Sequence, residues 1–89
     1  MRFRWNEWNV EKAAGRGVTP DEAEQVVQSA NRPYPQRHSD GRWLVWGRSE
    51  TGRSLQVVFL VDESDEIYVI HARPLTNKER RRDRRRRKR

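Results

Sequence analysis

The residues most capable of chemistry lie mainly in one short run near the C-terminal end of the chain. His71 has an imidazole that can accept or donate a proton near neutral pH. Arg73 follows a predicted strand, where a guanidinium can grip a phosphate through two parallel hydrogen bonds. Glu79 can accept a proton, and Arg80 follows it directly. Together with Arg53, from an upstream hairpin, these side chains form the predicted catalytic set for a reaction at a phosphodiester.

Three of these residues also have a structural interpretation, and the sequence leaves both open. Arg73 can pair with an acid of its own chain. His71 alternates with Ile67 and Val69, so it can be a half-buried residue on their sheet face. Glu79 stands three residues after a threonine, which is the spacing of a capping box at a helix start. If Arg73, Arg53 and Arg80 are functional, we expect them to converge on one phosphate site.

The end of the chain is almost purely basic. Residues 78–89 hold ten Lys or Arg and two acids, a net charge of +8, whereas residues 1–77 have a net charge of −1. The last apolar residue is Leu75, so we expect the tail to fray beyond about residue 83 and to be removable with little loss of stability. Such a tail can bind phosphates through counterion release, or it can be solvated with no dedicated partner. The tail arginines predicted to make such contacts are Arg81, Arg82, Arg84 and Arg85.

Composition limits the class of protein. The chain has 89 residues, enough for one domain, and no cysteine, which excludes disulfides and thiolate metal sites. No metal or cofactor is predicted, because His71 and His38 lack partners at ligand spacing. His38, beside Asp40, is a weaker candidate for proton transfer. Without a long apolar run or an apolar leader, a cytoplasmic protein with no membrane partner is expected.

The elements that must position these residues follow from cap signals and hydrophobic alternation. A short strand around Phe3 precedes a helix over about 7–14 that Asn6 can cap. Thr19 followed by Pro20 starts a second helix, which is expected to reach about residue 30.

The rest of the domain is predicted to be rich in strands. They are expected over 42–48, 54–61 and 66–72, with Gly52 at positive φ in the first hairpin. The side chains predicted inside are Trp43, Val57, Phe59 and Val69. The expected fold is therefore α+β, in the order β-α-α-β-β-β-α, with an antiparallel sheet covered by helices on one face.

A family resemblance covers nearly the whole chain. It is carried by the segments WNEWN at 5–9, GVTPDEAE at 17–24, GR at 47–48 and 52–53, VVF at 57–59 and VIHARPLTNKERR at 69–81. In this order they resemble BrnT-like toxins of bacterial type II toxin–antitoxin systems, within the RelE/ParE-like superfamily. The stretch ARPLTNKERR at 72–81 is the most specific part, and GVTPDEAE is the next.

The resemblance implies a RelE-like toxin domain over 1–77 and an arginine-rich C-terminal helix or tail over 78–89. It implies a metal-independent endoribonuclease that inhibits translation by cutting RNA. It also implies a cognate antitoxin, expected to resemble ribbon-helix-helix proteins, and a complex that can contact DNA. Family members often carry histidines just before the Gly-Val pair, where this chain has Lys12, Gly15 and Arg16. Lys12 and Arg16 can still hold a phosphate, so they are predicted to bind RNA together with the tail residues Arg81, Arg82, Arg84 and Arg85. The alternative function is a non-catalytic module that binds an antitoxin or nucleic acid.

Overall fold

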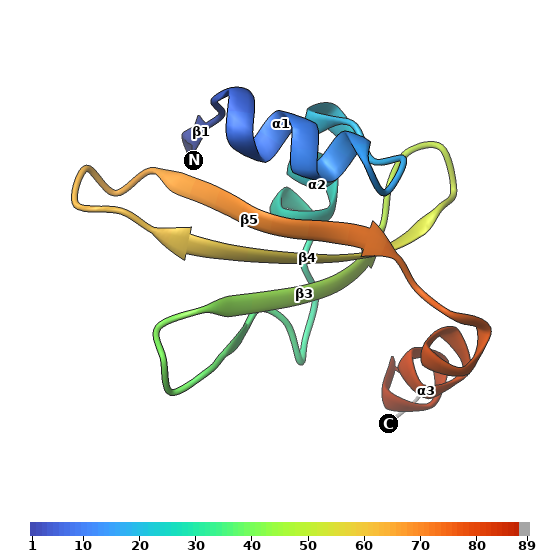
Figure 1. Ribbon diagram of the computed structural model, residues 1–89. Coiled ribbons are helices and arrows are strands. Elements are labelled where there is room, and N and C mark those ends of the chain that lie inside the picture. Colours follow the sequence, from blue (N-terminus) through green and yellow to red (C-terminus); the bar gives the residue numbers. More distant parts are fainter. Residues whose placement is uncertain (88–89) are drawn as a thin grey trace.

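An α+β fold with a mixed sheet is seen in the computed structural model, which describes residues 1–87 (Figure 1). Within this range the sheet has five strands in the order β1-β5-β4-β3-β2. The elements in chain order are β1 (Phe3–Arg4), α1 (Glu7–Ala14), α2 (Pro20–Gln28), β2 (Gln36–Arg37), β3 (Trp43–Arg48), β4 (Ser54–Val61), β5 (Ile67–Pro74) and α3 (Asn77–Arg87).

Side-chain caps begin the first two helices, as predicted. Asn6 accepts a hydrogen bond from the backbone N–H of Asn9, whose side chain bonds back to the N–H of Asn6. Thr19 and Glu22 form the same reciprocal box at the start of α2. The predicted bounds of α1 are confirmed, whereas α2 ends at Gln28, slightly before the expected position.

Two antiparallel hairpins, β3–β4 and β4–β5, form the centre of the sheet and confirm the predicted arrangement of those three strands. Gly52 has a φ of +85° in the first hairpin, also as predicted. The expectation of a wholly antiparallel sheet is wrong, because β1 pairs with β5 in parallel. The short strand β2, which pairs with β3, was not predicted. A strand of two residues carries too little alternation to show its partner or its direction.

A bulge in β5 changes which face His71 occupies. Val69 pairs with Phe59, but the next paired residue, His71, lies opposite Val58, so Ile70 is the extra residue. Val69 therefore stays on the helix-covered face, and His71 moves to the other face. The predicted alternation of His71 with Ile67 and Val69 on one face is wrong for this reason.

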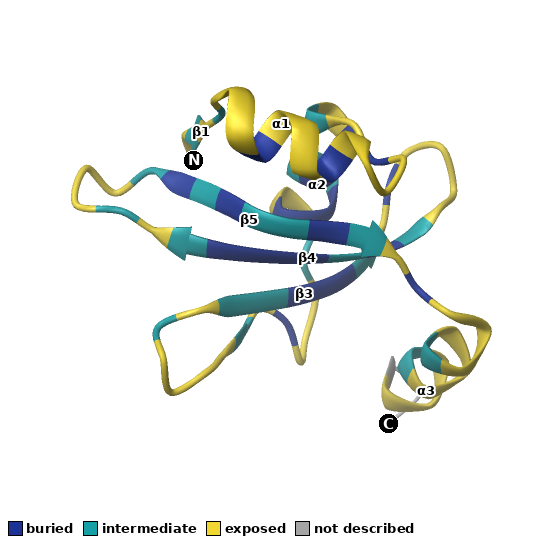
Figure 2. Ribbon diagram, viewed as in Figure 1, coloured by how far each residue is buried: buried dark blue, intermediate teal, exposed yellow. Residues whose placement is uncertain are grey.

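The core fills the space between the sheet and the helices α1 and α2 (Figure 2). Val57, Phe59 and Val69 are buried there, which confirms their predicted positions. Trp43 is only partly buried and stacks on Phe59, with ring centroids 6.4 Å apart. The face opposite α2, which we call the second face, carries the cross-strand pairs Leu44–Val58, Trp46–Gln56 and Arg48–Ser54, together with His71 and Arg73.

The C-terminal helix lies toward the second face, so the helices do not all cover one face as expected (Figure 1). The Arg86 guanidinium lies 5.6 Å from the ring centroid of Trp46, and its Nη1 donates to the Tyr34 hydroxyl at 3.4 Å. Burial, and next the charge of nearby Asp83, raise the pKa of Tyr34, although Arg86 opposes this. Fraying beyond residue 83 is not seen, because α3 is helical through Arg87. The predicted loose end at 88–89 lies outside the described residues.

The contacts of Arg86 alter the expected effect of changing the tail. Arg86→Ala removes a cation that covers Trp46 and contacts Tyr34, at an expected cost of about 0.5–1 kcal/mol. The melting temperature should fall by about 2–8 °C in a domain of this size. Thermal unfolding followed by circular dichroism measures this. Arg81→Ala, on an exposed position of the same helix, is the matched control, and an equal effect of both variants would contradict the docking of Arg86.

Candidate active site

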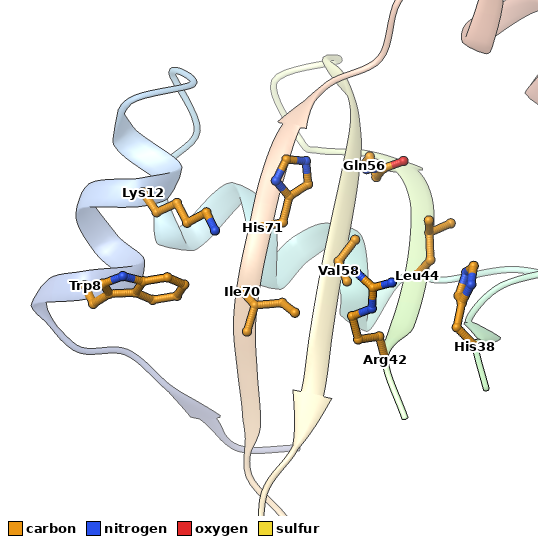
Figure 3. A pocket seen from close by; sticks show the side chains of 9 residues that line it. All are labelled: Trp8, Lys12, His38, Arg42, Leu44, Gln56, Val58, Ile70 and His71. Atoms are coloured by element: carbon orange, nitrogen blue, oxygen red, sulfur yellow. The ribbon is translucent and has the colours of Figure 1, made fainter. Parts of the chain in front are cut away.

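A hollow of about 560 Å³ opens on the second face of the sheet (Figure 3). Its floor is apolar and consists of Leu44, Val58 and Ile70. The remaining lining residues, which supply polar groups and one aromatic ring, are Trp8, Lys12, His38, Arg42, Gln56 and His71. We call it the His71 hollow. An apolar floor with a few converging polar groups is the usual form of a ligand site.

The rim on one side belongs to α1, which is held against β5 by a buried amide. Asn9 is 2% exposed, and its Nδ2 donates to the carbonyls of Arg4 and Val69 at 3.1 Å each. This anchoring places Trp8 and Lys12, one helical turn apart, beside the hollow (Figure 3). Trp8 was not predicted as a site residue, although its i, i+4 spacing from Lys12 on a predicted helix indicates that the two side chains are neighbours.

The rim on the other side belongs to the turn between β2 and β3. The backbone N–H of His38 donates to the carbonyl of Arg42 at 2.8 Å, which closes this turn. Arg42 Nε also donates to Asp40 Oδ2 at 2.6 Å. The structure thus places His38, the weaker sequence candidate, in the same hollow as His71. Arg42 was not predicted as a site residue.

His71 is held largely neutral near pH 7. Burial is the first cause that lowers its pKa, and the positive charges of Arg73, Arg16 and Lys12 lower it further. A neutral imidazole can accept a proton, and the three cations make its surroundings attractive to a phosphate. Two of the predicted RNA-binding residues, Lys12 and Arg16, are therefore close enough to influence the predicted proton acceptor.

Arg73 is paired with an acid of its own chain, which was one of its two predicted interpretations. Its Nη1 and Nη2 donate to Glu79 Oε1 and Oε2 at 2.7 and 2.8 Å, a two-point ion pair. Nη2 also donates to Gln56 Oε1 at 3.3 Å, across the sheet. Because both terminal nitrogens of its guanidinium bond to Glu79, Arg73 acts on the hollow through its positive charge, which lowers the pKa of His71.

Glu79 fulfils its predicted capping role. Its Oε1 accepts from the backbone N–H of Thr76 at 2.9 Å, and the Thr76 hydroxyl accepts from the N–H of Glu79 at 3.1 Å. The hydrogen bond from Arg73 is the main cause that lowers the pKa of Glu79 to about 2. The carboxylate is thus ionised at neutral pH and engaged on two sides, so its contacts are structural.

The expected convergence of three arginines on one site is not found among the described residues. Arg53 Nη1 donates to the carbonyl of Gly17 at 2.9 Å and lies 3.5 Å from Glu22 Oε1. Glu22 is buried and also accepts hydrogen bonds from Ser49 and Thr51, so Arg53 supports a structural network. The guanidinium of Arg80 instead bonds to Asn77 Oδ1 on its own helix.

The remaining predicted RNA-binding residues lie on α3. Arg81, Arg82, Arg84 and Arg85 follow one another along this helix, separate from the His71 hollow. Of these, Arg84 lines a second hollow, together with Arg80.

The Arg73–Glu79 pair predicts a change of stability with pH. The pKa of Glu79 is about 2 in the folded protein and about 4.5 when unfolded, so its stabilisation is present above pH 4.5 and is lost as pH falls toward 2. Because this is a two-point, charge-assisted pair whose side chains are 22% and 20% exposed, we expect a loss of about 1–2 kcal/mol. Urea unfolding of the wild type and of Glu79→Gln across this range measures the difference. An identical pH dependence in both proteins would contradict the assignment.

Within residues 1–87, no group of three or more His, Cys, Asp or Glu is placed to hold a metal ion. The helices in the same range are too short and too polar for any of them to cross a membrane. Comparison with protein-family models, with curated proteins and with solved structures finds no match.

Proposed function

We propose that this protein is an endoribonuclease that cuts single-stranded RNA in the His71 hollow without a metal ion. The supporting observation is the placement of a neutral histidine, a second histidine and two cations around one apolar-floored hollow. Phosphodiester cleavage needs a proton acceptor, a proton donor and positive charge near the phosphate, and this set of side chains supplies all three.

The proposed reaction uses the ribose 2′-hydroxyl as its nucleophile. His71 takes the 2′-hydroxyl proton as the oxygen attacks the neighbouring phosphorus, and the bond from phosphorus to the 5′-oxygen breaks. His38 protonates the departing 5′-oxygen, so the products carry a 2′,3′-cyclic phosphate and a 5′-hydroxyl. Lys12 and Arg42, which line the same hollow, stabilise the additional negative charge on the phosphate.

The exposed aromatic ring at the rim favours an unpaired substrate. Trp8 is 52% exposed and stacks against Tyr68, with ring centroids 6.3 Å apart and an interplanar angle of 15°. Aromatic side chains beside a basic surface are typical of proteins that bind single strands, because a base can stack on them.

The biological role that we propose is that of a toxin of the BrnT-like kind, with a RelE-like fold and an antitoxin as its partner. The α+β order of elements and the motif resemblance over 69–81 support this role. Cleavage of RNA would then halt translation until the antitoxin binds. The alternative is a non-catalytic module that binds the antitoxin or nucleic acid.

Incubation of the purified protein with end-labelled single-stranded RNA, in the presence of a chelator, tests the activity. We expect fragments that end in a 2′,3′-cyclic phosphate, and no cleavage of the same sequence made with 2′-deoxyribose. Salt-sensitive binding without any cleavage would contradict the enzyme and support the binding module. Cleavage only after a divalent metal is added would contradict the proposed mechanism.

A further inference from the structure

A second hollow of about 370 Å³ lies between α3 and the turn that joins β3 to β4. Three arginines line it: Arg48 from the end of β3, and Arg80 and Arg84 from α3. The other lining residues include Ser54, whose hydroxyl can donate a hydrogen bond, and the acid Asp83. We call it the Arg48 hollow. None of its arginines lines the His71 hollow.

The Arg48 hollow concentrates positive charge. Arg80 and Arg84 are like charges one helical turn apart, an arrangement that destabilises a helix by a few tenths of a kcal/mol. Asp83 offsets only one of the three cations, and its charge also acts on Tyr34. An anion bound between the arginines would relieve their repulsion. Guanidinium groups favour phosphate in particular, since they bind two of its oxygens at once.

The two hollows lie on the same face of the sheet. Leu44 and Val58 form the cross-strand pair beneath the His71 hollow, and Arg48 and Ser54 form the pair at the other hollow. Ser54 and Val58 are four positions apart on β4, which corresponds to about 13 Å at about 3.3 Å per residue. At this separation one extended strand of nucleic acid can reach both hollows. The intervening pair is Trp46–Gln56, and Arg86 of α3 covers the Trp46 ring, so such a strand passes over Arg86 rather than along the bare sheet.

We infer that the Arg48 hollow is a second phosphate site, which binds a backbone phosphodiester of the RNA strand whose cleaved bond lies beside His71. This inference rests on the proposed function and identifies its substrate as a single strand long enough to span both hollows. It also replaces the expected Arg53–Arg73–Arg80 site with a different set of arginines. Arg48, which was not among the predicted site residues, is the member supplied by the sheet.

Binding of uncleavable RNA to Arg48→Gln tests the inference. The probes are a dinucleotide, which is too short to span both hollows, and a 2′-O-methyl oligonucleotide long enough to span them. We expect Arg48→Gln to weaken binding of the long probe about fivefold to tenfold. The slope of the logarithm of the binding constant against the logarithm of the salt concentration should become shallower by about one. Dinucleotide binding should stay unchanged. Arg84→Gln should reproduce the effect, whereas Arg2→Gln, at the opposite end of the sheet, is the matched control.

Failure of the second phosphate site can be distinguished from failure of the proposed function. If the wild type binds the long probe and Arg48→Gln binds it equally well, the second phosphate site is wrong while the proposed function stands. If neither probe binds the wild type, the proposed function fails, and the inference fails with it. Inorganic phosphate is titrated separately. Arg48-dependent binding of phosphate, with no effect of Arg48 on the long probe, would show a free-anion site and overturn the inference. Circular dichroism confirms that each variant is folded.

Discussion

His71→Gln is expected to lower kcat/KM for RNA cleavage by at least about 100-fold, the usual contribution of a positioned acid or base. Glutamine keeps a polar side chain of similar size but cannot accept a proton at neutral pH. Because Lys12, Arg42 and the aromatic rim remain in place, the affinity for uncleavable RNA should change little. Single-turnover cleavage and equilibrium binding, measured on the same folded variant, separate the two effects.

The pH profile gives an independent measurement of the same role. A base must be neutral to act, and burial together with nearby cations lowers the pKa of His71 below its usual 6.5. Cleavage by the wild type should therefore rise with pH, and the midpoint of that rise should lie below pH 6.5. His38→Gln is the matched control, because it retains His71 and should therefore keep the rise with pH. Full activity of His71→Gln would remove this residue from the mechanism.

The sequence predicted most of the elements because their signals are local. The caps at Asn6, Thr19 and Thr76 are made within four residues of chain, so the residue types alone indicate them. The three long strands alternate clearly enough to place Val57 and Phe59 inside. The parallel pairing of β1 with β5 joins segments more than 60 residues apart, and no local pattern reports it.

The candidate site was only partly predictable, for two physical reasons. The bulge at Ile70 turns His71 to the second face, and a single extra residue leaves no clear mark in hydrophobic alternation. The other reason is that arginines select partners by proximity in the folded chain. Arg73 bonds to Glu79 and Arg53 bonds to Gly17, so these two arginines do not form the predicted phosphate site. Arg48 instead lines a hollow together with Arg80 and Arg84 at the end of the sheet.

Phe59→Ala is expected to lower the free energy of unfolding by about 3–5 kcal/mol. Phe59 is 4% exposed, and it lies on β4 between Trp43 of β3 and Val69 of β5, so the truncation opens a cavity where both hairpins meet. A domain of this size has a total stability of only about 5–10 kcal/mol, so a large fraction of the molecules should unfold well below the wild-type melting temperature. Urea unfolding followed by tryptophan fluorescence measures the loss.

The control for this variant lies two residues away on the same strand. Val61 is 48% exposed, so Val61→Ala should change stability by no more than about 0.5 kcal/mol. The contrast tests the register on which the site depends, because Phe59 pairs with Val69 immediately before the bulge that turns His71 to the second face. If Phe59→Ala unfolded like the wild type, the phase of β4 and β5 would be shifted by one residue. His71 would then face the core, and both its proposed role in proton transfer and its placement in the hollow would be wrong.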